Sequence, residues 1–205
     1  MAPMPMFPLG TVLLPSVGIP LHVFEPRYRA LVRDCLAGDH EFGVVLIIRG
    51  SEVGGADERA DVGTVARIVE AAELPDGRWA IGAVGVRRLR VREWLPADPY
   101  PRADVEAWPD ADPGPTHAVA LDQTVITMRR CLALAAEAGD HTAPATIELS
   151  DDPVLAGYQV AAVAPIGPHD RQRLLGATTP DDRLGALDEM LHDAVQVLEL
   201  RLAEG

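Results

Sequence analysis

The sequence contains no lysine and no asparagine, and all eighteen of its basic residues are arginines. Without lysine, the chain cannot build a Walker A phosphate loop, a Ser-Lys protease dyad or a Schiff base with a substrate carbonyl. Its 31 acidic residues outnumber the arginines and leave a net charge of −13. Because such a charge repels nucleic-acid phosphates unless the arginines gather in one patch, we expect no nucleic-acid partner.

Cysteine, serine and histidine are also scarce, and their spacing matches no common catalytic or metal-binding motif. The two cysteines, Cys35 and Cys131, lie far apart and outside any CxxC pattern, so we interpret both as buried, reduced thiols. The six histidines include no HExxH pair, and none of the three serines lies in a GxSxG motif. We therefore predict no metal, no cofactor and no enzymatic activity. A hydrolase whose triad assembles only in space remains an alternative.

No hydrophobic run is long enough to cross a membrane as a helix. The longest dense run, FGVVLII at 42–48, suits a buried strand. Residues 1–21 hold several prolines and no arginine, which makes a poor secretory signal. We expect a soluble, cytoplasmic protein with no membrane partner.

The first 112 residues have the pattern of a β domain. Four segments read as strands from their alternation or their buried apolar runs, and two shorter ones precede them. The segment Pro75-Asp76-Gly77 predicts a hairpin turn, since glycine readily adopts a positive φ. Gly82 and Gly85 predict a bend or bulge in the strand that follows. The predicted strands are 12–14, 21–24, 42–49, 64–74, 78–95 and 102–108.

The remaining residues, 113–205, have the pattern of a helical bundle. The segment PDADPGP, at 109–115, marks the boundary between the two domains. Asp152 and Thr179 each precede a proline that suits the first helical turn, so helices should begin after both. A helix over 116–139 and a last helix near the C-terminus each present an apolar face. These faces comprise Ala118, Leu121, Val125, Met128, Leu132 and Ala135 in the first and Leu184, Leu187, Leu191, Leu198 and Leu202 in the second.

The stretch PLHVFEPRYRALV, which starts at residue 20, joins a strand to a helix near 26–37. Its apolar residues recur at helical spacing from Tyr28 onward, and the arginines fall outside this stripe. Pro26 fits the first helical turn, and Glu25 lies where the helix dipole favours a carboxylate. We therefore interpret Glu25, Arg27 and Tyr28 as a structural junction between strand and helix rather than a catalytic cluster.

The longer stretch FPLGTVLLPSVGIPLHVFEPRYRALV, at 7–32, resembles the opening of the N-terminal domain of Lon proteases. Leu89 is a departure, because such domains often carry an aromatic residue there. The resemblance implies an α+β fold, with a PUA-like β domain over 1–112 and a helical subdomain over 113–205. It continues in order through FGVVLI (42–47), VGTVARI (62–68), LPDGR (74–78), GVRRLRV (85–91) and RQRLLGATTPDDRLGALDEML (171–191).

In Lon proteases this module recognises substrate proteins and supports assembly. The resemblance therefore implies a non-catalytic module that binds unfolded or partly folded polypeptides. The chain ends at Gly205, and its lack of lysine independently excludes both the ATPase loop and the peptidase dyad. We expect a stand-alone protein of this type in protein quality control, with a separate ATP-dependent protease as a second candidate partner.

Three aromatic residues lie near the proline-rich segments that end the β half, in a chain with only 4% aromatic residues. We interpret Trp94, Tyr100 and Trp108 as candidate substrate-binding residues, since rigid aromatic rings beside a groove can hold exposed apolar side chains. An alternative is that the same rings only seal the interface between the two halves.

A second alternative is RNA binding through the segment RRLRVRE, at 87–93. A strand would place Arg88, Arg90 and Arg92 on one face. We prefer the polypeptide partner, because the first 112 residues hold 17 acidic residues against 12 arginines and the acidic side chains can pair with these arginines across the sheet.

Overall fold

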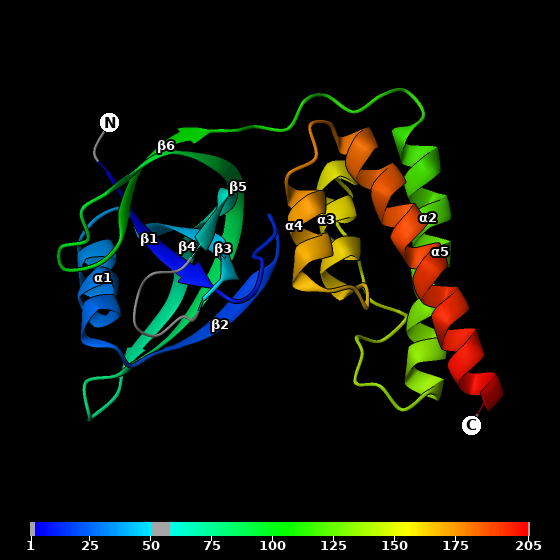
Figure 1. Ribbon diagram of the computed structural model, residues 1–205, viewed down its shortest axis with the longest axis horizontal. Coiled ribbons are helices and arrows are strands. Elements are labelled where there is room, and N and C mark those ends of the chain that lie inside the picture. The colour runs from blue at the N-terminus through cyan, green and yellow to red at the C-terminus, as the bar shows by residue number, and fades with distance from the viewer. Residues whose placement is uncertain (1–2, 51–57, 205) are drawn as a thin grey trace. The chain divides into compact units, whose positions relative to one another are not determined.

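The computed structural model describes residues 3–50 and 58–204, and it divides the chain into two compact units. The first unit, Met1–Pro109, holds the described strands and one helix, and the second unit, Asp110–Gly205, holds the other described helices (Figure 1). The predicted α+β class, a β domain followed by a helical bundle, is confirmed.

Six described strands form one sheet, and five of them close into a ring. Strand β1 pairs with β3 in parallel, and the antiparallel pairs β3–β4, β4–β5, β5–β6 and β6–β1 complete the ring. Strand β2 pairs with the first half of β5, whose second half pairs with β6. The strands are β1 (Met4–Leu9), β2 (Gly18–Val23), β3 (Glu41–Arg49), β4 (Glu58–Glu73), β5 (Trp79–Leu95) and β6 (Arg102–Ala107).

A tight turn joins β4 to β5, as predicted. The N–H of Leu74 donates to the carbonyl of Arg78 at 2.7 Å, and Gly77 has the positive φ of 77° that favours glycine. Beside Gly85 the pairing with β4 leaves Val86 of β5 unpaired, as a bulge in this strand requires, whereas beside Gly82 the unpaired residue is Val69 of β4.

Helix α1 (Pro26–Ala37) follows β2 directly, and its predicted apolar stripe is confirmed. Tyr28, Leu31 and Val32 are each 4% exposed or less. The ring of Tyr28 stacks on the ring of Phe7 in β1, with the centroids 4.1 Å apart. This contact attaches the first turn of the helix to the core of the ring of strands.

The second unit contains α2 (His117–Glu137), α3 (Pro153–Val163), α4 (Pro168–Leu175) and α5 (Pro180–Glu204). Helices α3 and α5 begin at the predicted prolines. Asp152 caps α3, because its carboxylate accepts a hydrogen bond from the N–H of Val154 at 2.9 Å. Helix α4 has no counterpart among the predicted elements, since it buries only Leu174 and Leu175 and is too short for a clear period.

The buried face of α2 differs from the predicted one at its N-terminal end. Ala118 is exposed, whereas His117 and Thr124 are buried. Both polar side chains have partners, since His117 Nδ1 lies 2.7 Å from Asp181 Oδ1 and the Thr124 hydroxyl donates to the carbonyl of Ala120. A prediction that counts only apolar residues as buried misses His117 and Thr124, because polar side chains can be buried when they are hydrogen-bonded.

The first strand also differs from the prediction. Residues 12–14 form no strand, although Leu13 and Leu14 are almost fully buried. The strand is instead β1, whose sequence MPMFPL contains two prolines. Proline argues against a strand in a sequence pattern, because it cannot donate to the ladder. The sequence pattern therefore predicts a strand at Leu13 and Leu14, which are buried but form no strand, and misses β1, which pairs with β3 and β6.

The boundary between the units lies between Pro109 and Asp110, in the same proline-rich segment as the predicted boundary after residue 112. Asp110 accepts hydrogen bonds from the guanidinium of Arg183 and from the hydroxyl of Tyr158. The Arg183 side chain is 2% exposed and lies 3.9 Å from the centroid of the Tyr158 ring. These contacts attach the start of the segment to the helices, which is why the helical unit begins at Asp110.

Candidate functional site

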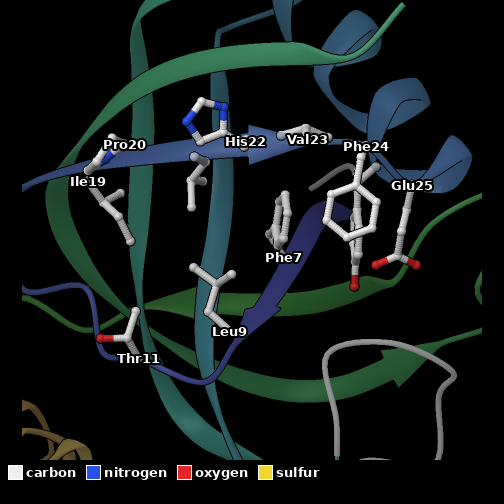
Figure 2. Close-up of a pocket in the computed structure, with 11 residues that line it drawn as sticks. Phe7, Leu9, Thr11, Ile19, Pro20, His22, Val23, Phe24 and Glu25 are labelled. Carbon is white, nitrogen blue, oxygen red and sulfur yellow. The ribbon is translucent and has the colours of Figure 1, made fainter.

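A cavity of about 410 Å³ opens between β1 and β2 in the first unit (Figure 2). Its size lies in the range of small-ligand pockets, and most of its lining side chains are apolar. The residues that line it come from β1, from β2 and from the first turn of α1, together with Thr11 after β1 and with Phe24 and Glu25 between β2 and α1. Every lining residue belongs to the β unit, so the site is complete within that unit.

Alternation along β2 builds one wall of the cavity. Figure 2 shows Ile19 pointing from β2 toward Leu9 and Phe7, which rise from β1, while His22 points the opposite way. Ile19 and Leu21 are partly buried, and their neighbours along the strand are exposed. This follows from the period of two in a strand, which sends successive side chains to opposite faces.

Phe24 and the strand-to-helix junction lie at one end of the cavity. Phe24 is 58% exposed and is one of the residues that line the cavity. Glu25 accepts a hydrogen bond from Arg27 Nε at 3.0 Å, and the Arg27 guanidinium lies 4.6 Å from the centroid of the Tyr28 ring. The charges of Glu25 and Arg27 compensate each other, so their ion pair adds no net charge to this end of the cavity.

The structure thus brings together Glu25, Arg27 and Tyr28, the residues predicted as a structural junction, and two of them line the cavity. Phe24 falls inside the predicted strand over 21–24, but β2 ends at Val23. The sequence contains a signal for this exposed ring. Leu21 and Val23 lie on one face of the strand, so alternation places the apolar Phe24 on the opposite, more exposed face.

Tyr100, one of the three aromatic residues predicted as candidate binding residues, lies in the core of the β unit. It is 7% exposed, and its hydroxyl donates to Asp34 Oδ2 at 2.6 Å. Burial, followed by this hydrogen bond, raises the pKa of Tyr100. Its ring packs with the cluster that includes Phe7 and Phe42. The side chain is therefore engaged in packing and does not line the cavity.

Trp94 and Trp108 are half-buried, and arginine side chains cover part of each ring. The guanidinium of Arg59 lies 4.3 Å from the centroid of Trp94, while Arg88 and Arg90 lie 4.1 and 4.2 Å from that of Trp108. Neither tryptophan lines the cavity between β1 and β2. The three predicted aromatic residues therefore have three different sets of neighbours.

The arginines on the predicted basic face are engaged within the β unit. Arg88 is 2% exposed, and Arg92 Nη2 donates to Glu106 Oε2 at 2.7 Å. Arg90 lies between the Trp108 ring and the carboxylate of Glu106, which is 4.0 Å away. Arg88 is therefore not part of an exposed basic face, whereas the side chains of Arg90 and Arg92 are 45% and 61% exposed and share Glu106 as an acidic neighbour.

Neither cysteine has the surroundings of a nucleophile. Both are free and buried, as predicted. Burial raises the pKa of Cys35 to about 12, with smaller contributions from Asp39 and Asp34, and burial also raises the pKa of Cys131. The thiolate that attacks substrates or binds metals is therefore disfavoured at both positions. Across residues 3–50 and 58–204, no cluster of three or more His, Cys, Asp or Glu side chains could hold a metal ion. The helices in these ranges include none that is long and apolar enough to span a membrane.

A family model described as the ATP-dependent protease La (LON) substrate-binding domain matches residues 3–193. The chain belongs to this family. The match extends over both units, from the first strand to the last helix. The resemblance to the N-terminal domain of Lon proteases is therefore confirmed.

Relatives and solved structures of the Lon family agree with this assignment. Lon protease 2 of Herpetosiphon aurantiacus is 27% identical over 201 residues, which cover 96% of this chain but 24% of that protein. A crystal structure of a Lon N-terminal domain protein from Xanthomonas campestris is 30% identical, with a TM-score of 0.66, and the match covers 91% of this chain and 97% of that one.

A second solved structure shows the same fold at lower identity. The N-terminal domain of a Lon protease from the Mycobacterium avium complex is 16% identical, with a TM-score of 0.69 and coverage of 93% of this chain and 98% of that one. The match to Lon proteases themselves is confined to one part of them, since this chain spans about a quarter of the length of the curated relatives.

Proposed function

We propose that this chain binds apolar segments of unfolded or partly folded polypeptides and has no catalytic activity of its own. The family description supports a substrate-binding role, and the relatives are named as proteases, whose substrates are polypeptides. A cytoplasmic quality-control role goes with this proposal. In that role a separate ATP-dependent protease would receive the bound polypeptide.

The observation that carries the proposal is the apolar cavity between β1 and β2, with an exposed aromatic ring at its end. Phe7, Leu9 and Leu21 are among the apolar residues that line it, and the exposed Phe24 adds apolar surface beside it. An apolar cavity of this size can admit a few apolar side chains of a bound polypeptide. The compensated pair of Glu25 and Arg27 favours an uncharged occupant.

The expected affinity is modest. Each apolar side chain that enters the cavity should contribute about 1.5–3 kcal/mol. Ordering a flexible polypeptide should cost about 2–5 kcal/mol, which offsets much of this gain. With room for only a few side chains, we expect dissociation constants in the micromolar range or weaker.

The test is a titration of a fluorescently labelled, reduced and carboxymethylated α-lactalbumin, which stays unfolded, followed by anisotropy. Phe24→Ala should weaken binding by about fivefold or more, because it removes the aromatic surface beside the cavity. Val69→Ala is the matched control, since Val69 is also a large exposed side chain of the β unit, at 64%, and does not line the cavity. Equal affinities for Phe24→Ala, Val69→Ala and the unmodified protein would contradict a site in the cavity.

Ionic strength and substitutions of the two tryptophans distinguish the cavity from other binding sites. Binding should survive a rise in ionic strength that screens exposed charges, because the proposed contact is apolar. Trp94 and Trp108 remain a second candidate contact, since both are partly exposed. A loss on Trp94→Ala or Trp108→Ala that exceeds the loss on Phe24→Ala would move the site to these residues.

A further inference from the structure

Strand β2 has one edge that no described strand covers. Each of the other five described strands pairs on both sides within the ring, whereas β2 pairs with β5 alone among the described strands. The cavity lies between β2 and β1, on the side of β2 away from β5. An uncovered edge next to an apolar cavity combines backbone hydrogen-bonding groups with side-chain pockets.

The register determines which backbone groups face the open edge. The carbonyl of Val17, just before β2, accepts a hydrogen bond from the N–H of Gly85 in β5 at 2.9 Å. The pairing then continues without a shift, so every second residue from Val17 onward directs its backbone groups toward β5. Gly18, Pro20 and His22 therefore direct theirs toward the open edge, and all three residues are exposed.

The position of Pro20 agrees with this assignment of alternate residues to the open edge. Proline has no N–H, and within a sheet it is tolerated where that side of the strand faces solvent. Pro20 lies on β2 at an edge-facing position by the register above. The open edge therefore offers the N–H groups of Gly18 and His22 and the carbonyl groups of Gly18, Pro20 and His22.

We propose that the bound polypeptide adds to this edge as an extended strand, with alternate apolar side chains entering the cavity. This inference rests on the proposed function and specifies how the polypeptide is held. An extended segment presents free N–H and C=O groups along its length, whereas a helix has already used its own groups internally. Six residues of β2 extend over about 20 Å, so the added segment should be about five or six residues long.

The same geometry defines the chemistry of the occupant. Side chains on one face of the added strand would meet Ile19, Leu21 and Leu9, which line the cavity, and side chains on the other face would point to solvent. The segment should therefore alternate apolar residues with residues of any type. Proline within the segment should prevent pairing at positions whose N–H faces β2. Pro20 also limits the number of hydrogen bonds, which keeps the complex weak and discourages edge-to-edge pairing of two copies.

Substitutions at the open edge test the backbone contribution. His22→Pro removes one edge-facing donor, and His22→Ala removes the same side chain but keeps the donor. His22→Pro should bind roughly fivefold more weakly than His22→Ala, because the two variants lack the same side chain and differ in the edge-facing donor. Pro20→Ala supplies a donor that the protein lacks and should tighten binding by a similar factor. Because Pro20→Ala places no proline in the strand, it remains informative if His22→Pro fails to fold.

The matching experiment on the ligand uses a decapeptide of alternating valine and serine with one fluorescent label. Two further versions carry backbone N-methyl groups either on all valines or on all serines. Only one of these sets can face β2 when the valines enter the cavity, because backbone direction and side-chain direction alternate together. One methylated peptide should therefore bind at least about tenfold more weakly, and the other should bind like the parent.

The outcomes separate this inference from the proposed function. Binding that depends on Phe24 but is indifferent to His22→Pro, Pro20→Ala and both methylated peptides would overturn strand addition and leave polypeptide binding intact. Failure of the unfolded protein to bind at all would overturn the proposed function itself. Sedimentation of the protein without peptide tests whether a second copy of the chain occupies the edge instead. A dimer of the unmodified chain that dissociates on His22→Pro would assign the edge to a second copy and overturn the inference.

Discussion

Glu41 is a buried carboxylate that two arginines keep charged. Its side chain is 7% exposed, and it accepts hydrogen bonds from Arg87 Nη1 at 3.0 Å and from Arg67 Nη2 at 2.7 Å. The hydrogen bond from Arg87 is the largest cause that lowers the pKa of Glu41 below its ordinary value of 4.5, and it outweighs the effect of burial. Because the three residues lie on β3, β4 and β5, the cluster links three neighbouring strands.

Substitution Glu41→Gln should lower the free energy of unfolding by about 1.5 kcal/mol near neutral pH, since it removes charge-assisted hydrogen bonds from a buried site. The native pKa lies below the unfolded value, so the contribution of the charged group is complete above the unfolded value and is lost as pH falls through the native one. Urea denaturation from neutral to acid pH should show the gap between wild type and Glu41→Gln narrowing below pH 4.5.

The control is Glu73→Gln, which removes another carboxylate of the β unit. Glu73 accepts a hydrogen bond from Arg33 at 2.9 Å, but both side chains are about half exposed. An exposed pair of this kind contributes about 0–1 kcal/mol, so the change should be small at every pH. A Glu41→Gln penalty that stayed constant through the acid range would show that charge is not its source.

At the scale of elements, β5 determines how the β unit closes. It is paired with β4 along most of its length, with β2 in its first half and with β6 in its second half. Register shifts in the pairing with β4 lie beside Gly82, which is within the part of β5 that pairs with β2, and beside Gly85, which follows the last residue that pairs with β2. Of these two glycines, only Gly85 has another backbone close to it. A Cβ there would lie 2.3 Å from the carbonyl oxygen of Leu14, whereas a Cβ at Gly82 would lie 3.6 Å from the Cβ of Glu70.

Substitution Gly85→Ala should therefore destabilise the protein by about 2 kcal/mol, because the backbone of Leu14 must move to admit the methyl group. The matched substitution Gly82→Ala, three residues earlier in the same strand, meets only ordinary van der Waals contact and should change stability by less than about 0.5 kcal/mol. Thermal and urea denaturation measure both. Equal effects would mean that the close approach of Leu14 does not control the packing of β5.

The elements also differ in how readily the sequence predicts them. Helices α3 and α5 begin at their predicted first residues, because a capping residue followed by proline acts locally. Strand β1 escapes prediction, because its two prolines argue locally against a strand. Its pairing with β3 and β6 overrides that local argument. Strand β4 begins at Glu58, ahead of the predicted start at residue 64, since its added residues pair with the end of β3.

At the scale of the whole molecule, the family match covers both units, but the candidate binding site lies in the β unit alone. The buried Arg183 and its partner Asp110 belong to the helical unit and account for part of that unit's own stability. The residues that line the cavity all belong to the β unit, whereas this buried ion pair belongs to the other unit.

The purified protein should neither hydrolyse ATP nor cleave casein. Both activities, in the forms known from phosphate loops and Ser-Lys dyads, require lysine, and the chain has none. Phosphate release and the loss of intact casein, each compared with a mock purification from the same host, measure the two activities. Activity above the mock in either assay, if it co-elutes with the protein, would contradict the non-catalytic proposal.

The sequence by itself determined the α+β order, the turn at Gly77, the stripe of α1 and the family, because these depend on signals that act over a few residues or on a long ordered motif. The absence of lysine also excludes whole classes of chemistry by composition alone, since no fold can supply a side chain that the chain does not contain.

Only the tertiary structure decided where the candidate site lies. The walls of the cavity come from β1 and β2, which are not paired with each other, so no local pattern predicts that a space remains between them. The tertiary structure also decided which aromatic side chains are exposed. Tyr100 and Phe24 are both aromatic residues near prolines, yet one packs in the core and the other lies in solvent. Which ring is free to bind depends on what packs over it, and distant parts of the chain supply that packing.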